Sequence, residues 1–328
     1  MGAKKTYILL FLFLFCGLRS FAQDVLMQTQ NIMRQEFLNP AYSSFKDFTS
    51  INLMSRYQWL NNLDGAPKTY AANVYIPVKL SGFGLGFTAI SQSIGLRQKM
   101  SFTSSFSHNV RVGLSDYLAL GYGFGLQNVS YDMNRLATHT DIDPGTLNLN
   151  ATNFSVCTGL FFYDPAFFVG LSTNVLFNKD SFDSGWLVPG FDFTTGFMVH
   201  VNRSLLFRPE VVLKYYPTKM YVVDGTQKNE SMVPPILDVG VSFLLGERLW
   251  LGTSHRLGEA QTFSVDVVVS ETFRFGYSYE LGLGNNVNQI SSHGIRLTWN
   301  IIPQRAFRGY DRSGRYNMKA MMGTNLYR

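Results

Sequence analysis

The stretch 101-SFTSSFSHNVRVGLSDYLALGYGFGLQNVSY-131 decides the fold, because two kinds of side chain alternate along it. From Phe102 to Val112 the even positions are mostly aromatic or aliphatic, and the odd positions carry Ser, Thr, Asn or Arg. From Leu118 to Leu126 the even positions are large and apolar, with Ala and Gly between them. The connection 113–116 contains the turn-forming residues Gly and Asp. The pattern predicts one long β-hairpin whose arms each have an apolar face and a small or polar face.

The length of these arms points to a membrane. A tilted strand needs about 9–11 residues to cross a bilayer, and each arm of 101–131 reaches that length with only a minimal turn between them. We therefore interpret the hairpin as two strands of a transmembrane β-barrel.

The composition supports the same class. The chain has 328 residues, of which 46% are hydrophobic and only 15% charged, with 28 Phe and 17 Tyr. This is too little charge for a disordered chain and too much aromatic content for an ordinary soluble surface. After residue 22 no apolar run reaches the roughly 18 residues that a membrane helix requires.

Residues 1–22 are typical of a secretory signal peptide, cleaved before Gln23. Two lysines precede an apolar run, and Ser20-Phe21-Ala22 offers small residues at the cleavage site. Lipidation at Cys16 is disfavoured, because bulky Phe15 precedes it. Removing these residues takes away two Lys and one Arg, so the net charge falls from +6 to +3, which gives little support to nucleic-acid binding. Only Cys157 remains, so an intramolecular disulfide is excluded.

We expect four segments. The signal peptide is followed by a periplasmic or plug-like segment, 23–48, with a short helix over 24–38 that Asn39-Pro40 ends. The outer-membrane barrel occupies 49–302, and a basic periplasmic tail occupies 303–328. About fourteen antiparallel strands in up-and-down order are predicted, near 49–59, 68–77, 83–91, 101–112, 117–131, 153–163, 166–177, 193–202, 204–216, 235–245, 248–257, 262–269, 271–281 and 293–302.

The predicted connections alternate in length. After every second strand the turn is tight, whereas most of the others are long, at 92–100, 132–152, 178–192, 217–234 and 282–292. Outer-membrane barrels have short periplasmic turns and longer extracellular loops. This parity places both termini in the periplasm.

A soluble β-sandwich also alternates, but two features favour the membrane. One parity of the strands carries almost no charge, and the other carries Arg56, Arg111, Arg208, Glu210, Asp238, Asp266, Arg274, Glu280 and Arg296. A Lys or Arg facing lipid costs about 2–4 kcal/mol at mid-membrane, so this segregation is expected for lumen-facing charges. The inner parity is otherwise rich in Gly, Ser, Thr and Asn. Aromatic residues near strand ends suit interfacial belts, namely Trp59, Tyr117, Tyr163 and Trp299.

No arrangement of residues predicts catalysis, a metal site or a cofactor. The five histidines lie in separate strands or loops without metal-ligand spacing. The glycines of 82–86 and 121–125 repeat with period two inside strands, unlike a phosphate-binding loop, so we expect them to leave room in the lumen or to allow curvature. The chain is therefore expected to be no enzyme.

The tail is strongly basic, with a single acid, Asp311. Either it is a solvated extension or it docks on an acidic periplasmic partner. The docking residues would be Arg305, Arg308, Arg312, Arg315 and Lys319.

Several motifs resemble the PorP/SprF family of outer-membrane proteins, associated with type IX secretion and gliding in Bacteroidota. They include Leu38–Tyr42 (LNPAY), Arg56–Trp59 (RYQW) and Gly65–Tyr70 (GAPKTY), followed by glycine-aromatic strands to about residue 302. The family-motif positions are Asn39, Pro40, Ala41, Tyr42, Arg56, Gln58, Trp59, Gly65, Ala66 and Pro67. The basic tail beyond the closing strand is a departure from the family pattern.

The resemblance implies a non-enzymatic role in export or surface anchoring of particular secreted proteins, often adhesins, through the C-terminal domains of those cargoes. It also implies contact with a periplasmic ring lipoprotein of the secretion machine. The motifs themselves either keep the fold or contact the cargo. The alternative function is a passive porin or small-solute transporter with selectivity set by lumen charges.

Overall fold

The computed structural model describes residues 35–46, 48–59, 65–78, 82–113, 116–131, 150–177, 187–202, 204–216, 219–224, 227–232, 235–270, 272–283 and 291–301. The expected signal peptide, the first part of the expected helix and the basic tail lie outside the described residues. Among the described residues no helix is long and apolar enough to cross a membrane.

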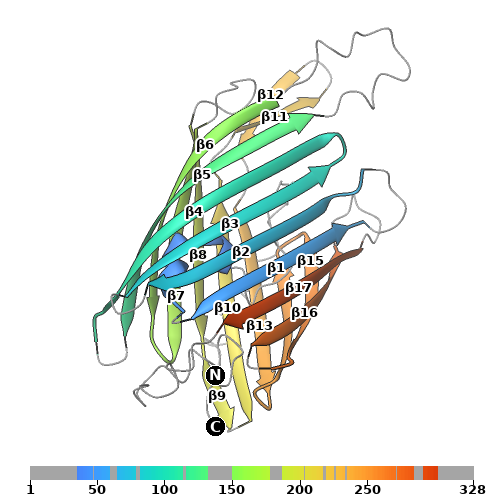
Figure 1. Ribbon diagram of the computed structural model, residues 1–328. Coiled ribbons are helices and arrows are strands. Elements are labelled where there is room, and N and C mark those ends of the chain that lie inside the picture. The colour runs from blue at the N-terminus through green and yellow to red at the C-terminus, as the bar shows by residue number, and fades with distance from the viewer. Residues whose placement is uncertain are drawn as a thin grey trace, which may run out of the picture.

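The architecture is a closed antiparallel β-barrel of fourteen strands, as predicted (Figure 1). Two short helices precede it, α2 (Gln35–Leu38) and the 3-10 helix η2 (Pro40–Ser44). The strands are β1 (Thr49–Gln58), β2 (Lys68–Val78), β3 (Phe83–Ile94), β4 (Arg97–Arg111), β5 (Tyr117–Tyr131), β6 (Asn150–Tyr163), β7 (Phe167–Phe177), β8 (Leu187–Phe197), β9 (Val199–Asn202), β10 (Leu205–Tyr215), β11 (Lys219–Asp224), β12 (Gln227–Met232), β13 (Ile236–Leu245), β14 (Leu249–Arg256), β15 (Ala260–Val268), β16 (Phe273–Gly282) and β17 (Ser291–Ile301).

Neighbouring strands pair in sequence order around the barrel. β8 and β9 form a single stave, interrupted at Met198, and both pair with β10. β10 then pairs with β13, so β11 and β12 are left out of the wall and form a separate two-stranded sheet. β17 closes the barrel on β1, with Ile301 opposite Thr49. The two ends of the barrel sequence therefore lie at the same rim.

Two rims can be distinguished by their connections. The short-turn rim, where β1 begins and β17 ends, carries brief links such as 164–166 and 246–248. The loop rim carries the long connections, including the one that contains β11 and β12, near the top of Figure 1. The predicted hairpin between residues 101 and 131 is confirmed. It is formed by β4 and β5, which pair antiparallel, with Ser101 opposite Gln127 and Arg111 opposite Tyr117.

One predicted loop was wrong. Residues 92–100 do not form a long loop, because β3 and β4 continue to Ile94 and Arg97 and are joined by the tight turn Gly95-Leu96. Gly95 has a φ of 57°, a left-handed conformation that glycine adopts without steric cost. Residues 217–234 do form a long connection between β10 and β13, as predicted, and they contain the β11–β12 hairpin, which alternation alone did not reveal.

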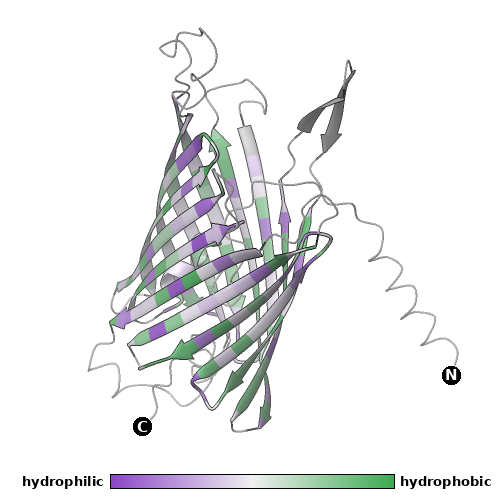
Figure 2. Cartoon of the chain, turned by 90° about the vertical axis from the view of Figure 1, so that its right-hand side faces the viewer, coloured by the Kyte–Doolittle hydropathy of each residue, from purple (hydrophilic) through white to green (hydrophobic). Residues whose placement is uncertain are grey.

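The outer face of the wall is apolar, as the parity predicted. Phe124 is 60% exposed and Trp299 59% exposed on the outside, whereas Arg274 and Arg296 are each 1% exposed on the inside. Figure 2 shows this alternation as successive hydrophobic and hydrophilic bands along the strands. The apolar outer face meets lipid, and the polar inner face is enclosed.

Candidate functional site: a plugged and charged barrel interior

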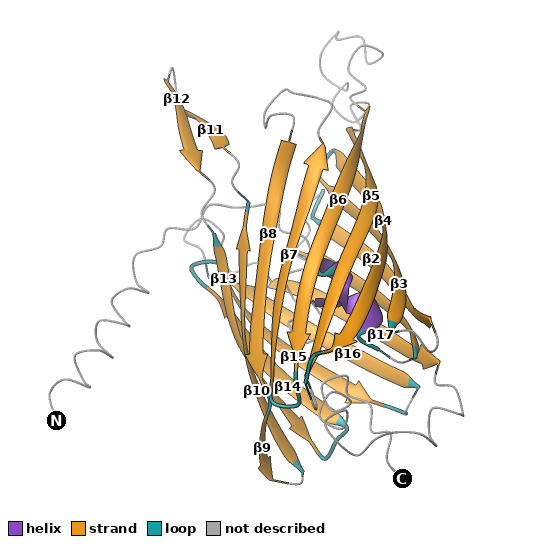
Figure 3. Ribbon diagram, turned by 90° about the vertical axis from the view of Figure 1, so that its left-hand side faces the viewer, coloured by secondary structure: helices purple, strands orange, loops and turns teal. Residues whose placement is uncertain are grey.

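The barrel interior is occupied by the segment that precedes β1. We call residues 39–46, which contain η2, the plug; they lie inside the barrel wall (Figure 3). All eight residues are buried, and Asn39 and Ala41 to Lys46 are each at most 6% exposed. A segment of the chain that is buried this completely is packed inside the barrel.

Asn39 organises the start of the plug. It is the N-cap of η2, with extended φ and ψ of −110° and 113°, and its side-chain oxygen accepts a hydrogen bond from the Ala41 amide at 3.0 Å. Pro40 follows at the first helical position, where its missing N–H is no loss. The side-chain amide nitrogen of Asn39 donates to the backbone carbonyl of Leu160 on β6 at 3.0 Å. One side chain therefore shapes the helix and fastens it to the wall.

A row of small residues on the inner wall receives the plug. These residues are directly opposite one another on β3 to β7, namely Gly84, Ser107, Gly121, Gly159 and Ser172. We call this row the seat.

The plug lies so close to the seat that side chains larger than hydrogen would collide with it. A Cβ on Gly159 would lie 2.1 Å from the Asn39 side-chain oxygen, and one on Gly121 would lie 2.1 Å from the Ala41 nitrogen. A Cβ on Gly84 would lie 2.0 Å from the carbonyl oxygen of Ser43, whose hydroxyl is 2.6 Å from that of Ser105. The glycines therefore leave room in the lumen, as expected, and the plug occupies that room.

Beyond the seat the plug packs into an aromatic cluster. Tyr42 meets Phe161 edge to face at 5.4 Å between ring centroids, and Phe45 meets Tyr163 in the same way at 4.8 Å. Tyr117 stacks on Tyr163 at 5.3 Å. Tyr117 and Tyr163 therefore line the lumen, and their predicted place in the interfacial belt was wrong, because both are on the inner parity at the end of their strands. The cluster continues along the wall from the β8–β9 stave to β14, with Met198, Leu206, Leu244 and Trp250.

A network of buried charges covers the inner wall towards the loop rim. Glu280 on β16 accepts a hydrogen bond from Arg56 on β1 at 2.6 Å and lies 3.4 Å from Arg256 on β14. Arg256 also lies 3.8 Å from Asp238 on β13. All four residues are at most 5% exposed. The network links strands from both ends of the barrel sequence.

A second charged group lies closer to the short-turn rim. Asp266 pairs with both Arg296 and Arg274, the latter at 3.7 Å. The Arg274 guanidinium lies over the ring of Trp250 at 5.8 Å, so the charges adjoin the aromatic cluster. On β10, Arg208 bonds Glu210 at 2.6 Å. It also lies 5.3 Å from the centroid of the Phe168 ring. Buried charges are tolerated when they are paired in this way.

The predicted site residues are thus divided between several places. Asn39, Pro40, Ala41 and Tyr42 form the plug, and Arg56, Arg208, Glu210, Arg274, Glu280 and Arg296 line the interior. Arg111 has the inner parity but is exposed at the short-turn rim, where its Nε donates to the Gly113 carbonyl at 3.0 Å. It does not belong to the enclosed charges, because it is the last residue of β4. The basic residues of the tail lie outside the described residues.

The remaining motif positions hold the loop rim together through the backbone. The Gln58 amide donates to Pro67 at 2.9 Å, and the Gly95 amide donates to Gly65 at 2.8 Å. The Trp59 amide reaches across to Ser291 on β17 at 3.0 Å. Ala66 lies between Gly65 and Pro67 in this connection. These contacts keep the fold of the rim.

The seat and the pairing of the charges were missed by the sequence reasoning. The period-two glycines of β3 and β5 carried a signal, but their alignment depends on strand register. Among the described residues no group of three or more His, Cys, Asp or Glu side chains has an arrangement that holds a metal ion.

Comparison with known proteins gives one decisive match. The model of the family described as "Type IX secretion system membrane protein PorP/SprF" matches residues 20–299. No curated protein sequence matches the chain.

Solved structures resemble the chain at low identity. The Ralstonia pickettii toluene transporter TbuX has 11% sequence identity and a TM-score of 0.49, and the match covers 83% of this chain and 93% of the TbuX chain. The Pseudomonas putida toluene transporter TodX has 9% identity and a TM-score of 0.48, with 82% and 94% covered. A Pseudomonas aeruginosa FadL homologue has 9% identity and a TM-score of 0.47, with 81% and 93% covered. The family match spans nearly the whole barrel and the plug, and the chain therefore belongs to the PorP/SprF family of type IX secretion system membrane proteins.

Proposed function

We propose that this barrel assists the export or surface anchoring of particular secreted, adhesin-like cargo proteins, acting on their C-terminal domains within a type IX secretion or gliding machinery. Family membership over residues 20–299 supports the proposal. The observation that carries it is the packed interior: Asn39 to Lys46 are buried inside the barrel, against the seat. A barrel closed by its own chain is suited to holding a partner at a rim.

The two rims suggest which partner is held where. In the proposed orientation the loop rim is extracellular and receives the cargo domain. The short-turn rim, where Thr49 pairs with Ile301, is periplasmic. The barrel sequence begins and ends at this rim. We propose that the N-terminal segment and the basic tail contact the periplasmic ring lipoprotein. The role is non-enzymatic and needs no cofactor.

The porin alternative is less favoured, because an open aqueous channel is incompatible with the plug on its seat. Reconstitution in planar bilayers separates the two functions. Steady conductance by the wild-type barrel would favour the porin.

The cellular experiment is deletion of this protein followed by fractionation of the secreted proteins. One or a few cargo proteins with a type IX C-terminal domain are expected to remain inside the cell or to be shed into the medium. Other cargoes of the same system are the internal control. Unchanged surface display of every cargo would refute the proposal.

A further inference from the structure

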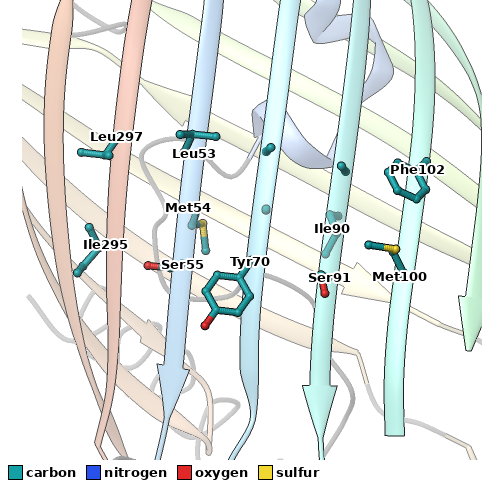
Figure 4. A pocket seen from close by; sticks show the side chains of 13 residues that line it. Leu53, Met54, Ser55, Tyr70, Ile90, Ser91, Met100, Phe102, Ile295 and Leu297 are labelled. Carbon is teal, nitrogen blue, oxygen red and sulfur yellow. The ribbon is translucent and has the colours of Figure 1, made fainter. Parts of the chain in front are cut away.

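The outer wall has a hollow within its apolar band. It lies over β17 and β1 to β4 and has a volume of about 380 Å³ (Figure 4). In the figure the side chains of Leu53, Tyr70, Met100 and Phe102 border it, and η2 lies behind the wall. These four side chains are 46–53% exposed on the outer face.

Two alanines on neighbouring strands create the hollow. Ala72 on β2 is directly opposite Ala89 on β3. Their other neighbours in the same row are large, with Leu53 opposite Ala72 and Phe102 opposite Ala89. A pair of methyl groups between large side chains leaves a depression in the surface that faces lipid. The occupant that this environment offers is a hydrocarbon chain.

Towards the loop rim the same outer face becomes polar. The Tyr57 and Tyr70 hydroxyls hydrogen-bond at 3.0 Å, and the Tyr277 hydroxyl lies 2.7 Å from Nδ1 of His293. Lys68 precedes Tyr70 on the outward parity of β2 and is exposed. Four residues separate Lys68 from Ala72, or about 13 Å along the strand. One lipid molecule can therefore span the distance from a headgroup near Lys68 to an acyl chain in the hollow.

The charge of this face selects the headgroup. On the described outward positions of β17 and β1 to β4, Lys68 is the one Lys or Arg, and there is no Asp or Glu. Tyrosine hydroxyls and the lysine ammonium are donors suited to phosphate oxygens. We propose that the hollow binds an acyl chain of a phosphorylated outer-leaflet lipid of the lipid A class, with Lys68 at its phosphate. The leaflet rests on the orientation given under the proposed function.

The test is native mass spectrometry of the purified full-length barrel in detergent, with lipid A or phosphatidylglycerol added. Ala72→Phe and Ala89→Phe fill the hollow, and Lys68→Gln removes the cation. Thr158→Phe is the matched control, because it adds an aromatic ring to the outer face of β6, away from the hollow. We expect the lipid A-bound fraction to fall at least tenfold in Ala72→Phe and Ala89→Phe and several-fold in Lys68→Gln. Thr158→Phe and Lys68→Arg are expected to retain it.

Equal lipid A retention in the wild type, in Ala72→Phe and in Ala89→Phe overturns the proposal. The absence of retained lipid from the wild type also overturns it. Retention of phosphatidylglycerol in place of lipid A, lost in the same variants, also overturns it. Surface display of cargo is measured separately in cells carrying Ala72→Phe. Loss of bound lipid with normal display of cargo would show that the lipid site is separate from the proposed function. Failure of the lipid proposal and failure of the proposed function are therefore distinguishable.

Discussion

Substitution of the seat glycines is expected to displace the plug. In Gly121→Ala the new Cβ would lie 2.1 Å from the Ala41 nitrogen, and in Gly84→Ala it would lie 2.0 Å from the Ser43 carbonyl oxygen. Ordinary contact begins at 3.4 Å, so the plug backbone has to withdraw by about 1.3–1.4 Å. Neither obstacle is a flexible side chain that can rotate away.

The cost can be estimated from two contributions. Overpacking of a dense interior costs about 1–3 kcal/mol. Withdrawal by this distance also breaks a hydrogen bond such as that from Asn39 to Leu160, worth about 1 kcal/mol. A total of about 2–4 kcal/mol shifts the ratio of seated to displaced plug by about 30- to 900-fold.

Single-channel recording in planar bilayers measures this shift. We expect Gly121→Ala and Gly84→Ala to raise the frequency of open events at least about tenfold over the wild type. Gly252→Ala on β14 is the control, because its Cβ would crowd the Ser264 and Ser242 hydroxyls, which can rotate, and would reach the Val241 carbonyl only at an ordinary contact distance of 3.6 Å. Heat-modifiable gel mobility verifies that each barrel is folded. If folded seat variants stay as closed as the wild type, the plug does not close the lumen.

Three further predictions concern stability, measured by urea unfolding in lipid vesicles. Glu280→Ala leaves Arg56 and its neighbours with an uncompensated buried charge, so the free energy of unfolding is expected to fall by about 3–5 kcal/mol. The control, Arg111→Ala at an exposed position, is expected to lose less than about 0.5 kcal/mol. Similar losses in both variants would show that the enclosed pairs are unimportant. Asn39→Ala removes the cap and the bond to the wall, and about 1–2 kcal/mol should be lost; no measurable loss would contradict the role of Asn39. Phe275→Arg places a cation on the lipid face and is expected to cost about 2–4 kcal/mol in vesicles, and a neutral result would mean that this face does not meet hydrocarbon.

The sequence by itself determined the fold class and most of the strands. The alternation in 101–131 is a local property, since successive side chains of a strand face opposite sides whatever the neighbours are. The apolar parity therefore identified the lipid face, and Arg274 and Arg296 fell inside as expected. Where local signals were weak the prediction failed at 92–100, where polar residues continue both strands, and it did not reveal the β11–β12 hairpin inside the predicted long connection 217–234.

Only the tertiary structure decided which inward residues meet. Gly84, Gly121 and Gly159 form one row because the registers of four successive strands happen to align them, and a shift of one residue in any pair would turn one of them outward. Arg56 reaches Glu280 across 224 residues of sequence because β17 closes on β1. The alternation of faces along a strand is determined by the local sequence. Strand register and barrel closure depend instead on contacts between segments far apart in the sequence, and register and closure form the seat and the charged inner wall.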